Sequence, residues 1–179
     1  MTSIEQLKFR KYFCNEIILP LLFAGGLYLV FRSSDTVVYQ LTSFVGLSGM
    51  VDLFRGFTVV NAFPEWFIYS LPGALWLLAF QNTISLLKKF TGKTLVPLIL
   101  LASLMGIGLE FFQYLNFTDG RFDIVDLLFY LGATFLALIN VWLIKNKWEL
   151  YAEGETSSSA LLGVLFVAFT FIIYLADIV

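Results

Sequence analysis

The chain has 179 residues, of which 59% are hydrophobic and 13% are charged, and its net charge is −2. This composition excludes a soluble globular domain, because too little polar surface is present to cover a globule of this size, and it predicts an all-α integral membrane protein. The low charge, with no stripe of Lys and Arg, also argues against nucleic acid as a partner.

Two residue types limit the chemistry of the chain. It has one cysteine, Cys14, and no histidine. An intramolecular disulfide, the common zinc, iron and copper ligand sets, and the Ser-His-Asp and Cys-His nucleophilic sites are therefore excluded. Any metal has to be a hard cation such as Ca²⁺ or Mg²⁺, bound by oxygen ligands.

The first apolar run covers residues 17–31 and follows a basic N-terminal segment. Because no small-x-small cleavage site follows this run, we interpret it as an uncleaved membrane span rather than a signal peptide. Pro20 lies inside it. We expect a neighbouring helix to satisfy the backbone group that this proline frees.

The rest of the chain predicts four more spans and one short helical segment. Residues 36–57 are too polar for a span, and we expect an interfacial or re-entrant helical segment there, with an ordinary extracytoplasmic loop helix as the alternative. The predicted spans are residues 64–87, 95–115, 124–144 and 160–174. Pro72 and Gly73 predict a kink about two turns into the first of these. The expected architecture is a single membrane domain, a bundle of about five transmembrane helices.

The basic residues predict how the bundle is oriented. A cytoplasmic N-terminus places eight of the 11 Lys and Arg residues inside and leaves Arg32, Arg55 and Arg121 outside. This distribution follows the positive-inside rule. With five spans the C-terminus is extracytoplasmic, and so is the turn between the third and fourth spans.

That turn carries the most polar part of the bundle. Within LEFFQYLNFTDGRFDIVDLLFYLG, the charged residues are Glu110, Asp119, Arg121, Asp123 and Asp126. Glu110 and Gln113 share one face of a helix, and Asp123 and Asp126 repeat this spacing at the start of the next helix. A short connection makes the two helices antiparallel neighbours. We therefore expect these four side chains to converge around Arg121.

The residues leave three interpretations of this cluster open. In the first it is structural: Arg121 pairs with Glu110 or Asp126, and Asp123 caps the next helix. In the second it binds a ligand: Arg121 would contact a phosphate or carboxylate, and Glu110, Asp123 and Asp126 would bind a cationic group, Ca²⁺ or Mg²⁺. In the third it is catalytic, with Glu110 as a general acid or base assisted by Asp126, although no nucleophile stands out.

A motif of six residues in this turn resembles the signature of the VanZ-like membrane protein family. Its residues are Glu110, Gln113, Arg121, Asp123, Asp126 and Gly132. Upstream, PEWFIYSLPGALWLL resembles a branch of that family with a Leu-Pro-x-x-Leu-Trp element, so that the resemblance covers about residues 64–145. The chain departs from the commoner pattern at Glu65, which stands near the place of an Asp-Lys pair, and it lacks the histidine found there.

The resemblance implies a small helical bundle in the bacterial cytoplasmic membrane, with its acidic motif on the outer side. The family's named member is linked to reduced susceptibility to teicoplanin-type glycopeptide antibiotics, which act at the cell envelope. We expect a non-catalytic binding or accessory protein that recognises a lipid-linked or cationic envelope ligand, or a partner subunit, among the membrane lipids. The alternative is an enzyme that modifies a lipid carrier or envelope glycan with Glu110 and Asp126. A transporter or channel subunit is less favoured, since few polar residues occupy the inner halves of the spans.

Overall fold

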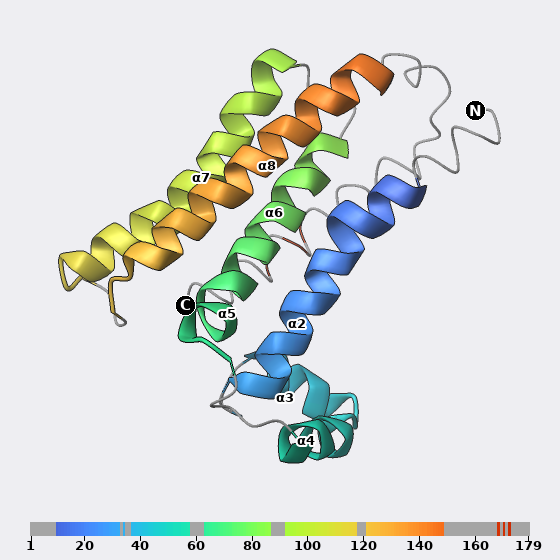
Figure 1. Ribbon diagram of the computed structural model, residues 1–179, viewed down its shortest axis with the longest axis vertical. Helices are drawn as coiled ribbons and strands as arrows, with labels where there is room; N and C mark the ends of the chain where they lie inside the picture. The colour runs from blue at the N-terminus through green and yellow to red at the C-terminus, as the bar shows by residue number, and fades with distance from the viewer. Residues whose placement is uncertain are drawn as a thin grey trace.

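The structure is a computed structural model that describes residues 10–32, 34, 37–57, 63–86, 92–117 and 121–148, together with positions 168, 170 and 172. Within these ranges the chain is helical and contains no strand, so the predicted all-α class is confirmed for this part of the protein. The longest helices lie side by side in Figure 1, in the order α7 (Gly92–Tyr114), α8 (Ile124–Trp148), α6 (Ser70–Leu86) and α2 (Leu19–Phe31) across the view.

Three described helices are long and apolar enough to cross a membrane: Arg10–Phe31, Thr94–Tyr114 and Ile124–Leu143. They correspond to the spans predicted at residues 17–31, 95–115 and 124–144. The last two belong to α7 (Gly92–Tyr114) and α8 (Ile124–Trp148). The span predicted at 160–174 lies outside the described residues, apart from three helical positions. The count of five spans therefore stays a prediction.

The span predicted at residues 64–87 is two helices rather than one kinked helix. The chain forms α5 (Glu65–Ile68), breaks at Tyr69, and continues as α6 (Ser70–Leu86). The break comes before Pro72, which therefore lies in the first turn of α6, where a missing N–H interrupts no helical hydrogen bond. With 17 residues, α6 extends over only about 26 Å at a rise of about 1.5 Å per residue.

Pro20 explains an irregular turn in the first helix. Residues Cys14–Ile18 form a π-helical turn, η1, which leads into α2 (Leu19–Phe31). In an α-helix the N–H of residue 20 would donate to the carbonyl of Glu16, and proline has no N–H to give. Instead, Asn82 Nδ2 on α6 donates to the Glu16 carbonyl oxygen at 3.0 Å. The expectation that a neighbouring helix satisfies this freed group is confirmed.

The core surrounds α6, which packs against α8, α2 and α7. Every residue from Ser70 to Ile84 is buried or half-buried, as expected of a largely apolar helix without charged residues. Leu77, Ile99 and Ala137, from α6, α7 and α8, are fully buried in one cluster. On the other side of α6, Tyr28 of α2 lies with its ring 4.7 Å from that of Trp76.

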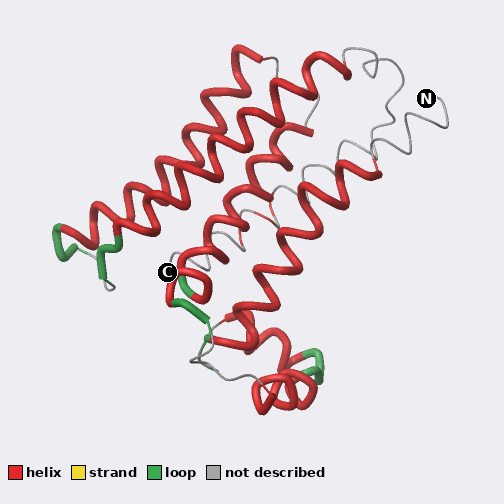
Figure 2. Tube along the Cα trace, in the orientation of Figure 1, coloured by secondary structure: helices red, strands yellow, loops and turns green. Residues whose placement is uncertain are grey.

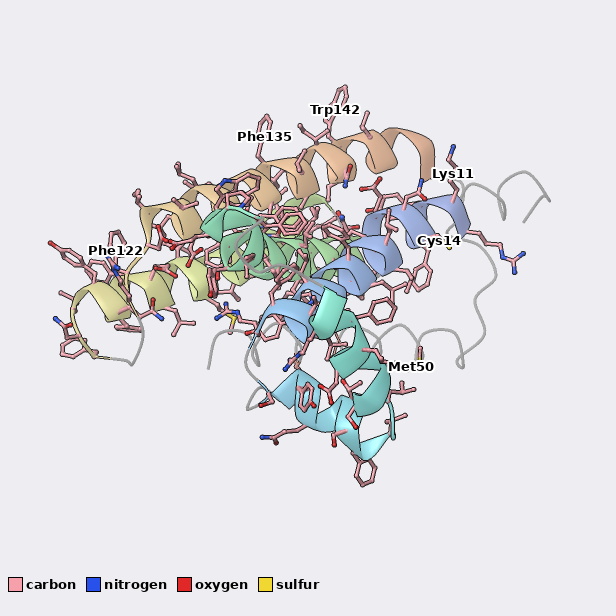
Figure 3. All side chains as sticks on the ribbon, turned by 60° about the horizontal axis from the view of Figure 1, so that its bottom comes forward. Lys11, Cys14, Met50, Phe122, Phe135 and Trp142 are labelled. Carbon is pink, nitrogen blue, oxygen red and sulfur yellow. The ribbon has the colours of Figure 1, made fainter. Side chains whose placement is uncertain are left out.

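The outer surface of α8 is apolar and faces away from the bundle. Figure 3 shows Phe135 and Trp142 projecting outward from α8, and both side chains are exposed. Large exposed apolar side chains on a long helix are what contact with lipid hydrocarbon requires. The described helices are therefore compatible with a membrane location.

The described part of the predicted segment 36–57, residues 37–57, forms two short helices at the far end of α2 (Figure 1), α3 (Val37–Phe44) and α4 (Ser48–Phe57). With 8 and 10 residues, neither is long enough to span a membrane. Gly46, at φ 82°, forms the left-handed turn that ends α3. The prediction of helix without a span is confirmed, and the interfacial location stays a prediction.

Arg55 joins α4 to the end of α2. Its Nε donates to the Leu29 carbonyl at 2.7 Å, and its Nη2 donates to the Arg32 carbonyl at 2.9 Å. These carbonyls belong to the last turn of a helix, where no intrahelical donor is available. The Arg55 guanidinium also lies over the ring of Tyr39, 4.5 Å from its centroid. The short helices are therefore held at a fixed place on the bundle.

Candidate functional site

The candidate site lies at the turn between α7 and α8, and it depends on how α7 ends. Asn116 adopts a left-handed conformation with φ 57°. Its N–H donates to the Gln113 carbonyl at 3.0 Å, and the Phe117 N–H donates to the Phe112 carbonyl at 2.9 Å. This pair of hydrogen bonds is a Schellman motif, with asparagine where glycine is most common. The described parts of the connection, residues 115–117 and 121–123, are drawn as loop in Figure 2.

Asp123 begins α8 as its N-cap. Its Oδ1 accepts a hydrogen bond from the Val125 N–H at 2.8 Å, which satisfies one of the free donors at the start of a helix. The prediction that Asp123 caps this helix is confirmed. In a capping box, the third helical residue would accept the N–H of the cap itself. That residue here is Asp126, but the N–H of Asp123 donates to Glu110 Oε2 on α7 at 3.0 Å.

Glu110 therefore ties the end of α7 to the start of α8. Its side chain is only 5% exposed, and its hydrogen-bond donor is a main-chain group at the positive end of α8. A carboxylate moved away from water is costly unless it gains such partners. The contact fixes Glu110 beside the first turn of α8.

The carboxyl groups of Glu110 and Asp126 form what we call the acid pair. The two groups lie within hydrogen-bonding reach of each other. Asp126 Oδ1 is buried and has no hydrogen-bond partner in the described part of the chain. Two like charges this close, with little water, repel each other unless a proton or another positive charge lies between them. The arrangement is suited to a cationic group.

Arg121 does not provide that positive charge. Its side chain is exposed, and it forms no ion pair or hydrogen bond with any described residue. The structure thus brings Glu110, Asp123 and Asp126 together and leaves Arg121 at the surface, which differs from the convergence expected from the sequence. The physical reason is that the main-chain N–H groups of α8 satisfy Glu110 and Asp123, whereas an arginine drawn inside would lose its hydration. Gln113 is half-buried, one turn beyond Glu110.

The described residues contain no group of three or more acidic or cysteine side chains arranged to hold a metal ion. One reason is that Asp123 Oδ1 already accepts the hydrogen bond from Val125. The Ca²⁺ or Mg²⁺ ion considered for Glu110, Asp123 and Asp126 therefore has no preformed ligand set in this part of the protein. An organic cation, which needs fewer oxygen ligands, fits the acid pair better.

No family model matches this chain. Comparison with characterised proteins and with solved structures also gives no match. The resemblance to the VanZ-like family therefore stays a prediction.

A second set of polar residues joins the helices deeper in the bundle. We call Gln81, Ser103 and Thr134, from α6, α7 and α8, the Gln81 layer. Gln81 is fully buried, and its Nε2 donates to Ser103 Oγ at 2.8 Å and to Thr134 Oγ1 at 3.2 Å. The Ser103 and Thr134 hydroxyls are 2.6 Å apart. Gln81 Oε1 has no partner among the described residues.

A third set, which we call the Glu16 group, consists of Glu16 on η1, Asn82 on α6 and Asn140 on α8. Asn140 Nδ2 donates to Glu16 Oε2 at 3.1 Å and to Asn82 Oδ1 at 3.3 Å. The sequence indicates few polar residues in the inner halves of the predicted spans, and the structure brings two of them, Asn82 and Asn140, together with Glu16, which precedes the first predicted span. The signal available in the sequence was the polar run Gln81-Asn82-Thr83 inside an otherwise apolar helix.

Proposed function

We propose that the protein is a multi-spanning, VanZ-like protein of the bacterial cytoplasmic membrane that acts at the cell envelope without catalysis. It binds an ammonium or guanidinium group at the acid pair, and that group belongs to a lipid-linked envelope component or to a partner subunit. The observation that carries the proposal is Asp126 Oδ1, which is buried beside Glu110 without a hydrogen-bond partner in the described part of the chain. A cationic donor would satisfy this oxygen and offset the charge of the pair.

Two further features support this choice of ligand. Arg121 is exposed at the same turn and unpaired with any described residue, so it is free to contact a phosphate. A headgroup that carries both groups would then place its ammonium at the acid pair and its phosphate at Arg121. The distribution of basic residues, eight against three, supports an extracytoplasmic position for this turn.

The test is lipid binding to the full chain in nanodiscs or detergent. Phosphatidylethanolamine carries the ammonium group, and phosphatidylglycerol is the matched lipid without it. We expect Asp126→Asn to weaken binding of the ammonium lipid tenfold or more, since a charge-assisted hydrogen bond contributes about 1.5–3 kcal/mol. Glu65→Gln, at an exposed acid that begins α5, is the control and should bind as the wild type does.

Glu110→Gln provides a second variant of the same pair. If Asp126→Asn and Glu110→Gln both fold normally and bind ammonium lipid with wild-type affinity, the acid pair is not a cation site. Binding that falls equally in Glu65→Gln would point to nonspecific surface charge and would also count against the proposal.

A membrane enzyme is the second candidate function, and one observation favours it. Glu110 is almost completely buried beside a second carboxyl group, and acid–base catalysis often uses two carboxyls in different environments. Such an enzyme would modify a lipid carrier or an envelope glycan. It predicts turnover of isoprenoid-phosphate or glycolipid substrates, with Mg²⁺ or Ca²⁺ present, that is lost in both Glu110→Gln and Asp126→Asn. Absence of turnover by the purified wild type would contradict it.

A further inference from the structure

The Glu16 group lies at the opposite end of the bundle from the acid pair. Lys11 and Cys14, near the start of the same helix as Glu16, are at one end of the molecule in Figure 3, and Phe122, beside the acid pair, is at the other. The group joins three helices, because Glu16 is on η1, Asn82 on α6 and Asn140 on α8. An acidic residue inside an apolar helix is unusual, and it indicates a site whose partner has to be identified.

No positive side chain that the structure describes forms an ion pair with Glu16. The part of α6 that packs on it has no charged residue from Ser70 to Leu86, and α8 has only Asp126 between Ile124 and Leu143. On its own helix, Arg10 and Lys11 are exposed. Glu16 is half-buried, and its carboxylate accepts a hydrogen bond from the neutral amide of Asn140.

The Glu16 group presents several oxygen atoms. The Glu16 carbonyl lies at the π-helical turn and accepts the hydrogen bond from Asn82 Nδ2, and Asn82 Oδ1 lies 3.3 Å from Asn140 Nδ2. In membrane transporters, carbonyl oxygens at interruptions of a spanning helix coordinate Na⁺ and protons. A π-helical turn, moreover, is uncommon and occurs frequently at functional sites.

The position of Asn140 shows where a cation would lie. Its Nδ2 sits between Glu16 Oε2 at 3.1 Å and Asn82 Oδ1 at 3.3 Å, so a positively polarised group already occupies the space between two oxygens. A half-turn of the Asn140 amide would place Oδ1 there instead. Three oxygens would then face one another, an arrangement that is repulsive when empty and favourable around a hard cation.

We propose that the Glu16 group is a binding site for a monovalent metal cation of the Na⁺ class. A single carboxylate balances one positive charge, whereas a divalent ion would leave a net positive charge among neutral groups that are buried or half-buried. The ligands are the Glu16 carboxylate and the side-chain oxygens of Asn82 and Asn140. The site is separate from the acid pair, and the proposal does not depend on the function assigned there.

The experiment measures thermal unfolding of the full chain in detergent, in sodium chloride and in choline chloride at equal ionic strength. A ligand that binds only the folded state raises the unfolding midpoint, by about 3–6 °C for a chain of this size when sodium is at roughly ten times its Kd. We expect this rise in the wild type and in Glu65→Gln, and its loss in Glu16→Gln. Binding of radioactive sodium should follow the same pattern.

Asn140→Ala keeps the proposal testable if Glu16→Gln does not fold, because it leaves the carboxylate in place and removes one oxygen ligand. It should weaken sodium binding tenfold or more. Equal midpoints in sodium and choline for the wild type would overturn the proposal, as would a sodium effect that persists in the folded variants. A midpoint that changes with pH in a Glu16-dependent way but not with sodium would identify a proton instead, and would also overturn it.

Discussion

The hydrogen bond from Asn82 to the Glu16 carbonyl connects Pro20 with the packing of α2 on α6. Mutations of Asn82 and Pro20 test this connection. Replacing Asn82 by alanine removes the donor and leaves this carbonyl without a side-chain partner. An unsatisfied buried acceptor costs about 1–3 kcal/mol. We therefore expect Asn82→Ala to reduce the free energy of unfolding by roughly that amount, with a further loss from its contact with Asn140.

The size of the effect should depend on residue 20. In a Pro20→Ala background, the main-chain N–H at position 20 is available to the Glu16 carbonyl four residues earlier, as in an ordinary α-helix. Asn82→Ala should then cost about 1 kcal/mol less than it does with Pro20, within the range of coupling energies measured for residues that share one interaction. The contact with Asn140 is lost in both backgrounds, so its contribution cancels in this comparison.

The assay is a double-mutant cycle of equilibrium unfolding in mixed micelles, followed by tryptophan fluorescence. The four proteins are the wild type, Pro20→Ala, Asn82→Ala and the double variant. Agreement of the two Asn82→Ala costs within about 0.5 kcal/mol would mean that the sites act independently. In that case Asn82 does not contact the Glu16 carbonyl because of Pro20, and the link between Pro20 and the packing of η1 on α6 is refuted.

Three further predictions concern single residues. Asp123→Ala removes the cap of α8 and should lower the free energy of unfolding by about 0.5–2 kcal/mol, measured by chemical unfolding, whereas Asp123→Asn should restore most of it. Gly132→Ala should fold normally and raise the free energy of unfolding by about 0.5–1 kcal/mol, since a Cβ there meets no described atom within 4 Å. A clear fall in the free energy of unfolding would show that another group packs closely against this motif residue. The hydrogen bond to Asp52 raises the pKa of Tyr39 above its ordinary 10.0, so its stabilising effect is present below pH 10 and lost as the pH rises through the raised pKa. Asp52→Ala should lower the pH at which the Tyr39 phenolate forms, measured as the absorbance difference from Tyr39→Phe, and an unchanged titration would contradict the contact.

The parts of the fold that could be predicted from the sequence are those set by local signals. The helices at 95–115 and 124–144 were found because long apolar runs end at turn-forming residues, and Asp123 was found because an acid one residue before such a run is a typical N-cap. The break at Tyr69 was not predicted. Proline marks where a helix interior cannot continue, but it is equally suited to a first turn, and the sequence alone does not distinguish these positions.

The candidate site could be predicted only in part, for a reason that applies to polar clusters generally. Glu110, Asp123 and Asp126 are close in the sequence, so a short turn brings them together. The surface position of Arg121 depends on a competition between hydrogen-bond donors for the acids. Main-chain N–H groups at the start of a helix need no rearrangement to bond them, whereas an arginine side chain does. Glu16 is separated from Asn140 by 124 residues. No spacing rule connects them, and only the packing of α2 and α8 on α6 brings them into contact.

The Gln81 layer fixes the positions of the acid pair and the Glu16 group relative to each other. With a rise of about 1.5 Å per residue, Thr134 lies ~12 Å along α8 from Asp126 and ~9 Å from Asn140, so the layer stands between them. A slip of α8 by one residue against α6 would turn Thr134 about 100° away from Gln81 and leave buried polar atoms without partners. The same slip would separate Asn140 from Glu16 and would move Asp126 relative to Glu110. The hydrogen bonds of Gln81 to Ser103 and Thr134 therefore hold the three helices in the register that assembles both sites.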